Sequence, residues 1–101
     1  MTDAEIRDNT ELHRYELPVG DQVAVVTYNL SEPTLMITET LVPQALEGQG
    51  IASRLAKHVL EDAKARDLLI LPVCPFFSSY LQKHPEHAEV VHPTYRGILG
   101  I

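Results

Sequence analysis

The chain has 101 residues, and this length predicts one compact domain that spans residues 1–101. Hydrophobic residues make up 45% of the chain and charged residues 22%, a balance that is typical of folded globular proteins and excludes general disorder. The formal net charge is −6 with only 8 Lys and Arg residues, so the composition offers no chain-wide basic surface. We therefore expect no nucleic-acid partner.

Cysteine content and the lack of long apolar runs bear on the location of the protein. Cys74 is the single cysteine and cannot form an internal disulfide, so the composition gives no reason to expect an oxidising compartment. The first five residues are mostly polar, and no apolar run approaches the roughly 20 residues that span a bilayer. We expect a cytoplasmic protein with no export signal and no membrane anchor, and the sequence leaves its oligomeric state open.

The first half of the chain is predicted to be mostly β-structure. Residues 1–10 are polar and lack a period, so we expect them to be flexible. Three later segments alternate or are rich in β-branched residues, and turn-forming Pro, Gly and Asp separate them. They predict an antiparallel meander of strands over residues 12–17, 22–30 and 34–42. Strict alternation along the third strand places Leu35, Ile37, Glu39 and Leu41 on one face.

The second half of the chain changes to a helical period. Apolar residues recur at helical spacing after Gly50, which predicts a long amphipathic helix that begins at Gly50 or Ile51. Residues 68–73 predict a buried strand that pairs in parallel after this helix, with Pro72 interrupting its pairing near the end. A short helix is predicted over residues 76–83, and residues 86–101 receive no assignment. The expected fold class is α+β, with a mixed, mostly antiparallel sheet, one long helix and one short helix.

The loop that joins the third strand to the long helix is a candidate anion site. Backbone N–H groups at the start of a helix have no intrahelical partner, so they attract anions. Gly48 and Gly50 lack a Cβ atom, which permits unusual φ angles and lets a phosphate approach the main chain. The alternative interpretation of this segment is a simple turn between a strand and a helix.

The segment VPQALEGQGIA at residues 42–52, followed by the amphipathic helix, resembles motif A of the GNAT acyltransferase superfamily. That motif has Arg or Gln, two residues, Gly, one residue, and then Gly or Ala, and it cradles the pyrophosphate of coenzyme A. Gly50 and Ala52 match the motif, whereas Glu47 replaces the Arg or Gln. The resemblance implies that acetyl-CoA is contacted by Leu41, Val42, Glu47, Gly48, Gln49, Gly50, Ile51, Ala52 and Ser53.

Two further segments extend the resemblance to roughly residues 12–92. LPVCPF at residues 71–76 and YLQKHPE at residues 80–86 are similar to the "CPF" and "Y-x-x-x-H-P-E" elements of a short GNAT-like branch. The resemblance implies a GNAT-like fold whose central sheet splays apart. The pantetheine arm of the co-substrate acetyl-CoA would lie in the opening, between the strand that ends at Val42 and the strand that ends at Val73, paired with backbone groups.

Three side chains are candidates for catalysis. Cys74 is either a small buried hydrophobe or a reactive thiol, and the resemblance implies that it lies beside the acetyl group. Tyr80 is either a general acid, as the superfamily implies for this helix, or a packed aromatic residue. Glu39 would suit a general base, but a solvated carboxylate is the alternative, and the branch has His at this place. Direct attack by an amine is expected in preference to an acetyl-cysteine intermediate.

His84, His87 and His92 raise the question of a metal site. Pro85 breaks the helix between the first two, and no cysteine pair accompanies them, so we expect no metal and expect His84 to cap the helix.

The expected function is acetyl transfer from acetyl-CoA to an amine. The chain is shorter than a full acetyltransferase of this superfamily, so we expect an open acceptor site that suits a protein lysine or N-terminus. Two other classes remain as alternatives. One is a non-catalytic acyl-CoA-binding module, and the other is a structural protein that uses the fold alone.

Overall fold

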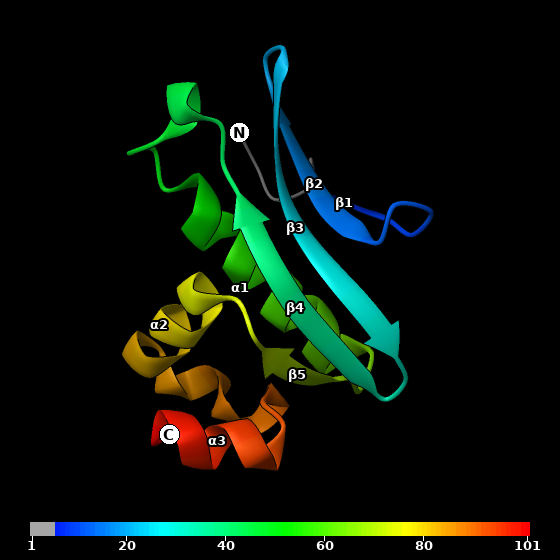
Figure 1. The fold of residues 1–101 in the computed structure, drawn as a ribbon, viewed down its shortest axis with the longest axis vertical. Coiled ribbons are helices and arrows are strands. Elements are labelled where there is room, and N and C mark those ends of the chain that lie inside the picture. Colours follow the sequence, from blue (N-terminus) through cyan, green and yellow to red (C-terminus); the bar gives the residue numbers. More distant parts are fainter. Residues whose placement is uncertain (1–5) are drawn as a thin grey trace.

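Figure 1 shows the computed structural model of the chain, which describes residues 6–101. Its central sheet has the strand order β1-β2-β3-β4-β5. The first four strands pair as antiparallel neighbours, and β5 pairs in parallel with β4. The predicted α+β fold with a mixed, mostly antiparallel sheet is confirmed. The strands are β1 (Arg7–Asn9), β2 (Arg14–Val19), β3 (Gln22–Ser31), β4 (Thr34–Leu41) and β5 (Leu69–Pro72).

The helices of the described residues all follow β4. They are the 3-10 helix η2 (Gln44–Leu46), α1 (Ile51–Ala65), α2 (Pro75–Lys83), the 3-10 helix η3 (Pro85–Val90) and α3 (Pro93–Leu99). The predicted long and short helices correspond to α1 and α2, while the unassigned C-terminal segment forms η3 and α3. Val91 lies beside Ile70, and the His92 N–H donates to the Ile70 carbonyl at 2.9 Å. This segment therefore covers the outer edge of β5.

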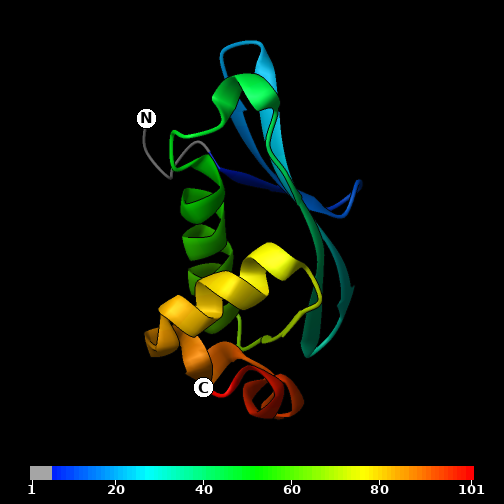
Figure 2. The same ribbon diagram turned by 60° about the vertical axis from the view of Figure 1, so that its left-hand side comes forward.

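Helix α1 packs its apolar side on one face of the sheet, which places the core between them (Figure 2). The largest fully buried side chains include Tyr15, Leu17, Leu35, Ile37, Leu55, Leu60, Ile70, Phe77 and Leu81. Within residues 6–101, no helix covers the opposite face, which we call the helix-free face. On this face Val23 is 43% exposed and Leu41 is 50% exposed. None of the described helices is both long enough and apolar enough to cross a membrane.

The expectation that residues 1–10 are flexible is wrong for residues 7–9, which form the edge strand β1. Asp8 holds this strand in place, because it accepts a hydrogen bond from the Tyr28 hydroxyl and also binds Arg66. Both partners are far from Asp8 in the sequence, so no local pattern could reveal them. Residues 1–5 lie outside the described part of the chain.

The alternation predicted for the third strand is wrong beyond Ile37. Tyr28 pairs with Ile37 but Thr27 pairs with Glu39, so Thr38 is an extra residue in β4 and forms a β-bulge. After the bulge, Thr40 lies opposite the buried Val26 on the helix-covered face. Glu39 and Leu41 lie on the helix-free face, where both are exposed.

Glu16 is a buried carboxylate on the helix-free face of β2. It is 4% exposed and accepts hydrogen bonds from Arg14 Nε at 2.7 Å, Asn9 Nδ2 at 3.2 Å and Arg7 Nε at 3.3 Å. The bond from Arg14 is the main cause that holds the pKa of Glu16 below its ordinary value, although burial opposes this effect. The cluster joins β1 to β2.

We predict that Glu16→Gln lowers the free energy of unfolding at pH 7 by about 1–3 kcal/mol, because bonds to a charged acceptor are lost. The pKa of Glu16 is lower in the folded protein than in the unfolded chain. The ionised carboxylate therefore contributes its full stabilisation at any pH above its pKa in the unfolded chain, and this stabilisation is lost as the pH falls through its pKa in the folded protein. Urea unfolding at a series of pH values should show that the wild type loses stability as the pH falls below 4.5, the ordinary pKa of a Glu carboxyl. The variant should lose less stability over the same pH range. The exposed control Glu11→Gln should behave like the wild type. Unchanged stability and acid sensitivity in Glu16→Gln would contradict this role.

Candidate functional site

The edge of β4 is open along its C-terminal half. Pairing with β5 runs from Thr34 opposite Leu69 to Ile37 opposite Pro72. The Cys74 N–H then donates to the Ile37 carbonyl at 3.0 Å, and the chain turns away into α2. No described strand pairs with the β5 side of β4 beyond this point. An extended ligand that carries amide groups could therefore add to this edge as a strand does.

A small hollow lies where the loop after β4 meets α1. Its volume is about 170 Å³, and it is lined by Val42, Leu46, Glu47, Gly48, Gly50, Ile51, Ala52 and Ser53. Gly48 has φ +82° and Gly50 has φ +72°, and Gly50 is the N-cap of α1. These positive φ angles are unfavourable for residues with a Cβ atom, which explains why both positions suit glycine.

The N-terminus of α1 is free to bind an anion. The N-cap has no side chain to satisfy the first amides, and the first turn contains no acidic residue. The Arg54 N–H is bonded to the Gly50 carbonyl at 3.0 Å, so the amides before it, at Ile51, Ala52 and Ser53, precede the intrahelical ladder. Glu47 and Gln49 are exposed, and solvent can therefore screen the Glu47 carboxylate. This arrangement suits a phosphate or diphosphate group.

Cys74 lies at the N-cap of α2, at the open edge of β4. Its side chain is buried at 3% exposure, and its Sγ atom lies 3.4 Å from Thr40 Oγ1. The β-bulge brings this contact about, because it turns Thr40 to the helix-covered face. Cys74 therefore adjoins the opening, but its thiol has little access to solvent.

Tyr80 lies on α2 and is half-buried. Its ring stacks on His84, with ring centroids 4.2 Å apart, and it also lies near Phe76. Burial is the main cause that raises the pKa of Tyr80 above its ordinary value, and the negative charges of Glu86 and Glu61 add to the effect. The phenol therefore stays protonated at neutral pH.

His84 is the C-cap residue of α2, the position expected from the sequence, and its Nδ1 lies 3.3 Å from a carboxylate oxygen of Glu86. Across residues 6–101, no group of three or more His, Cys, Asp or Glu side chains is arranged to hold a metal ion.

Glu39 is separated from Cys74 and Tyr80 by the sheet. It is exposed on the helix-free face, next to Thr27, whereas Cys74 contacts Thr40 on the helix-covered side. The structure thus places Cys74 at the end of the opening but does not place Glu39 on the same side of β4.

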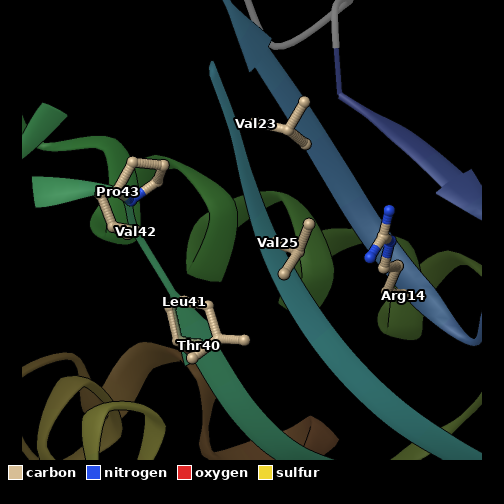
Figure 3. A pocket seen from close by; sticks show the side chains of 7 residues that line it. All are labelled: Arg14, Val23, Val25, Thr40, Leu41, Val42 and Pro43. Atoms are coloured by element: carbon tan, nitrogen blue, oxygen red, sulfur yellow. The ribbon is translucent and has the colours of Figure 1, made fainter. Parts of the chain in front are cut away.

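A groove on the helix-free face was not identified from the sequence. It has a volume of about 490 Å³ and runs from Arg14 on β2 across β3 to the end of β4 (Figure 3). Val23, Val25 and Leu41 form its apolar floor. The only sequence signal for this groove would have been exposed apolar residues, such as Val23 and Leu41, in strands that otherwise alternate. Its position depends on the β-bulge, which has no clear sequence signal.

Comparison with known proteins agrees with this architecture. The family model described as GCN5-related N-acetyl-transferase matches residues 14–90. The solution NMR structure of a GCN5-like protein from Staphylococcus aureus is similar, with a TM-score of 0.70 and 26% sequence identity over 91% of each chain. A search of curated proteins gave no significant match. The matched model covers β2 to η3, which includes the loop, the opening and Cys74, and the chain belongs to the GCN5-related N-acetyltransferase family.

Proposed function

We propose that this protein transfers the acetyl group of acetyl-CoA to an amine, with residues 1–101 acting as a single domain in the cytoplasm. The observation that carries the proposal is the open edge of β4, which leads directly to the hollow at the N-terminus of α1. GCN5-related N-acetyltransferases generally use acetyl-CoA, and this pair of features suits two neighbouring parts of that molecule. The hollow suits the diphosphate, and the open edge suits the amide-containing arm.

The main chain supplies most of the cofactor contacts in this proposal. Backbone groups of Leu41 and Val42 would pair with the amides of the pantetheine arm. The diphosphate would be bound by the segment from Glu47 to Ser53, with the α1 amides as donors. Glu47 lines the hollow but is exposed, so solvent can screen its charge.

In the proposed acetyl transfer, the general base and the general acid come from opposite sides of β4. The acceptor nitrogen attacks the thioester carbonyl, a C–N bond forms, the C–S bond breaks and the thiolate leaves. Glu39 on the helix-free face would take a proton from the acceptor ammonium, which leaves the neutral amine as the nucleophile, and Tyr80 on the helix-covered side would donate a proton to the thiolate. With Glu39 and Tyr80 on opposite sides of β4, the acceptor amine would approach from the helix-free face and the thioester from the helix-covered side.

The burial of Cys74 supports direct transfer over an acetyl-cysteine intermediate. A nucleophilic thiol must be exposed enough to reach the thioester, whereas this side chain is 3% exposed. We propose that Cys74 shapes the end of the opening next to Thr40.

The helix-free face supports a large acceptor. The groove there is open, and no described element encloses it, which suits a protein lysine or N-terminus better than a small molecule that needs a closed pocket.

We predict that Gly50→Ala weakens acetyl-CoA binding by about tenfold, because a side chain at φ +72° costs about 1–2 kcal/mol and the α1 amides would shift to relieve it. An added Cβ atom meets no atom within 4 Å, so the effect would come from the backbone alone. Gly97→Ala is the matched control, since Gly97 is helical and its Cβ would also lie in open space. Calorimetric titration with acetyl-CoA measures both. Equal affinity in the two variants would argue against the loop as the diphosphate site.

We predict that Tyr80→Phe lowers kcat by about 100-fold, because a positioned general acid contributes at least that much. The phenylalanine ring preserves the stacking on His84, so the fold should be retained.

Cys74→Ala should keep kcat within about threefold, since direct transfer needs no thiol nucleophile. A CoA-release assay with a mixture of amine acceptors measures both variants.

The same assay separates the alternatives. Loss of activity in Cys74→Ala, together with an acetylated wild-type protein in mass spectrometry, would show the covalent route. Acetyl-CoA binding without CoA release by the wild type would identify a non-catalytic binding module.

A further inference from the structure

Arg14 lines the groove on the helix-free face, and Glu39 lies beside the groove on the same face, two residues before Leu41. Arg14 on β2 pairs with Thr27 on β3, which in turn pairs with Glu39 on β4, so these residues form one row across the sheet. Arg14 and Glu39 lie two strands apart, a separation of about 10 Å between their backbones. The Arg14 guanidinium binds Glu16 through Nε, and the side chain remains 36% exposed.

The apolar floor lies in the next row of the sheet, where Val25 is flanked by Leu41 on β4 and by the buried Glu16 on β2. Val25 pairs with Leu41 on the same face, and Val23 follows two residues away on β3. Leu41 is 50% exposed and Val23 is 43% exposed, because no described helix covers this face. An apolar stem of several carbons would bury this surface favourably.

The groove is continuous with the proposed cofactor site. Val42 lines both the groove and the hollow at the N-terminus of α1. A ligand in the groove would therefore lie against the same end of β4 as the cofactor, but on the opposite face. In the proposed complex, this arrangement would place the β4 end of the ligand near the acetyl group.

We propose that the groove binds a peptide lysine that has an acidic residue nearby in the peptide. The lysine stem lies on Val25 and Leu41 with its ammonium group toward Glu39, and the carboxylate of the neighbouring residue lies toward Arg14. A lysine fits better than a peptide N-terminus, because an α-amine has no apolar stem to cover the floor. The inference rests on the proposed acetyltransferase function and adds the acceptor's chemical class.

The test uses peptides blocked at both ends that contain one lysine, with Glu, Ala or Arg two positions before or after it. Wild-type kcat/KM in the CoA-release assay should be highest with Glu and lowest with Arg, by about fivefold, as expected for partly exposed charge pairs. Arg14→Gln keeps a donor for Glu16 but removes the charge, so it should abolish this preference. The exposed control Lys57→Gln on α1 should retain it.

Equal kcat/KM across the wild-type panel would overturn the inference even if Arg14→Gln failed to fold. Faster acetylation of a lysine-free peptide with an open N-terminus would also overturn it. Both outcomes leave the proposed function intact, because they require turnover. Absence of acetyl-CoA binding in calorimetry would instead remove the proposed function and this inference together.

Discussion

The backbone of β4 is paired on both sides only as far as Ile37, and the rest of the site depends on this limit. Pro72 has no N–H to donate, and the Cys74 N–H makes the last bond to β4 before α2 begins. Without this separation β5 would continue along β4 and close the edge. Instead, β4 and β5 pair at one end and separate at the other. The opening between them can hold an extended molecule.

The β-bulge at Thr38 determines what lies on each side of the opening. It turns Thr40 toward Cys74 and leaves Glu39 and Leu41 on the helix-free face. The helix-covered side thus contains the α1 N-terminus, Cys74 and α2, which are suited to a phosphate-bearing co-substrate. The helix-free side contains the apolar groove and a free carboxylate, which are suited to an amine. In the proposed function, a sheet that is covered on one face by α1 and bare on the other binds its two reactants on opposite faces.

The sequence predicted the parts of the fold that depend on local patterns. The meander, the long helix, the parallel strand and the short helix each have a period or a turn signal, and the loop around Gly48 and Gly50 is identifiable because backbone chemistry needs glycine there. The edge strand β1 was missed because Asp8 is held by residues distant in the chain. The bulge was missed because one inserted residue leaves no periodic trace, and the face assigned to Glu39 was wrong for the same reason. The groove depends on that bulge and on the register of three strands, so it required the structure.

The most direct test of the central claim is a titration of the ¹⁵N-labelled protein with CoA, followed through its backbone amide resonances. We expect the largest shifts at Thr38 to Val42 and at Ile51 to Ser53, and little change in the amides of β1 and β2. Shifts confined to other elements, or no shifts at millimolar CoA, would contradict the claim that the open edge of β4 and the α1 N-terminus form one binding site.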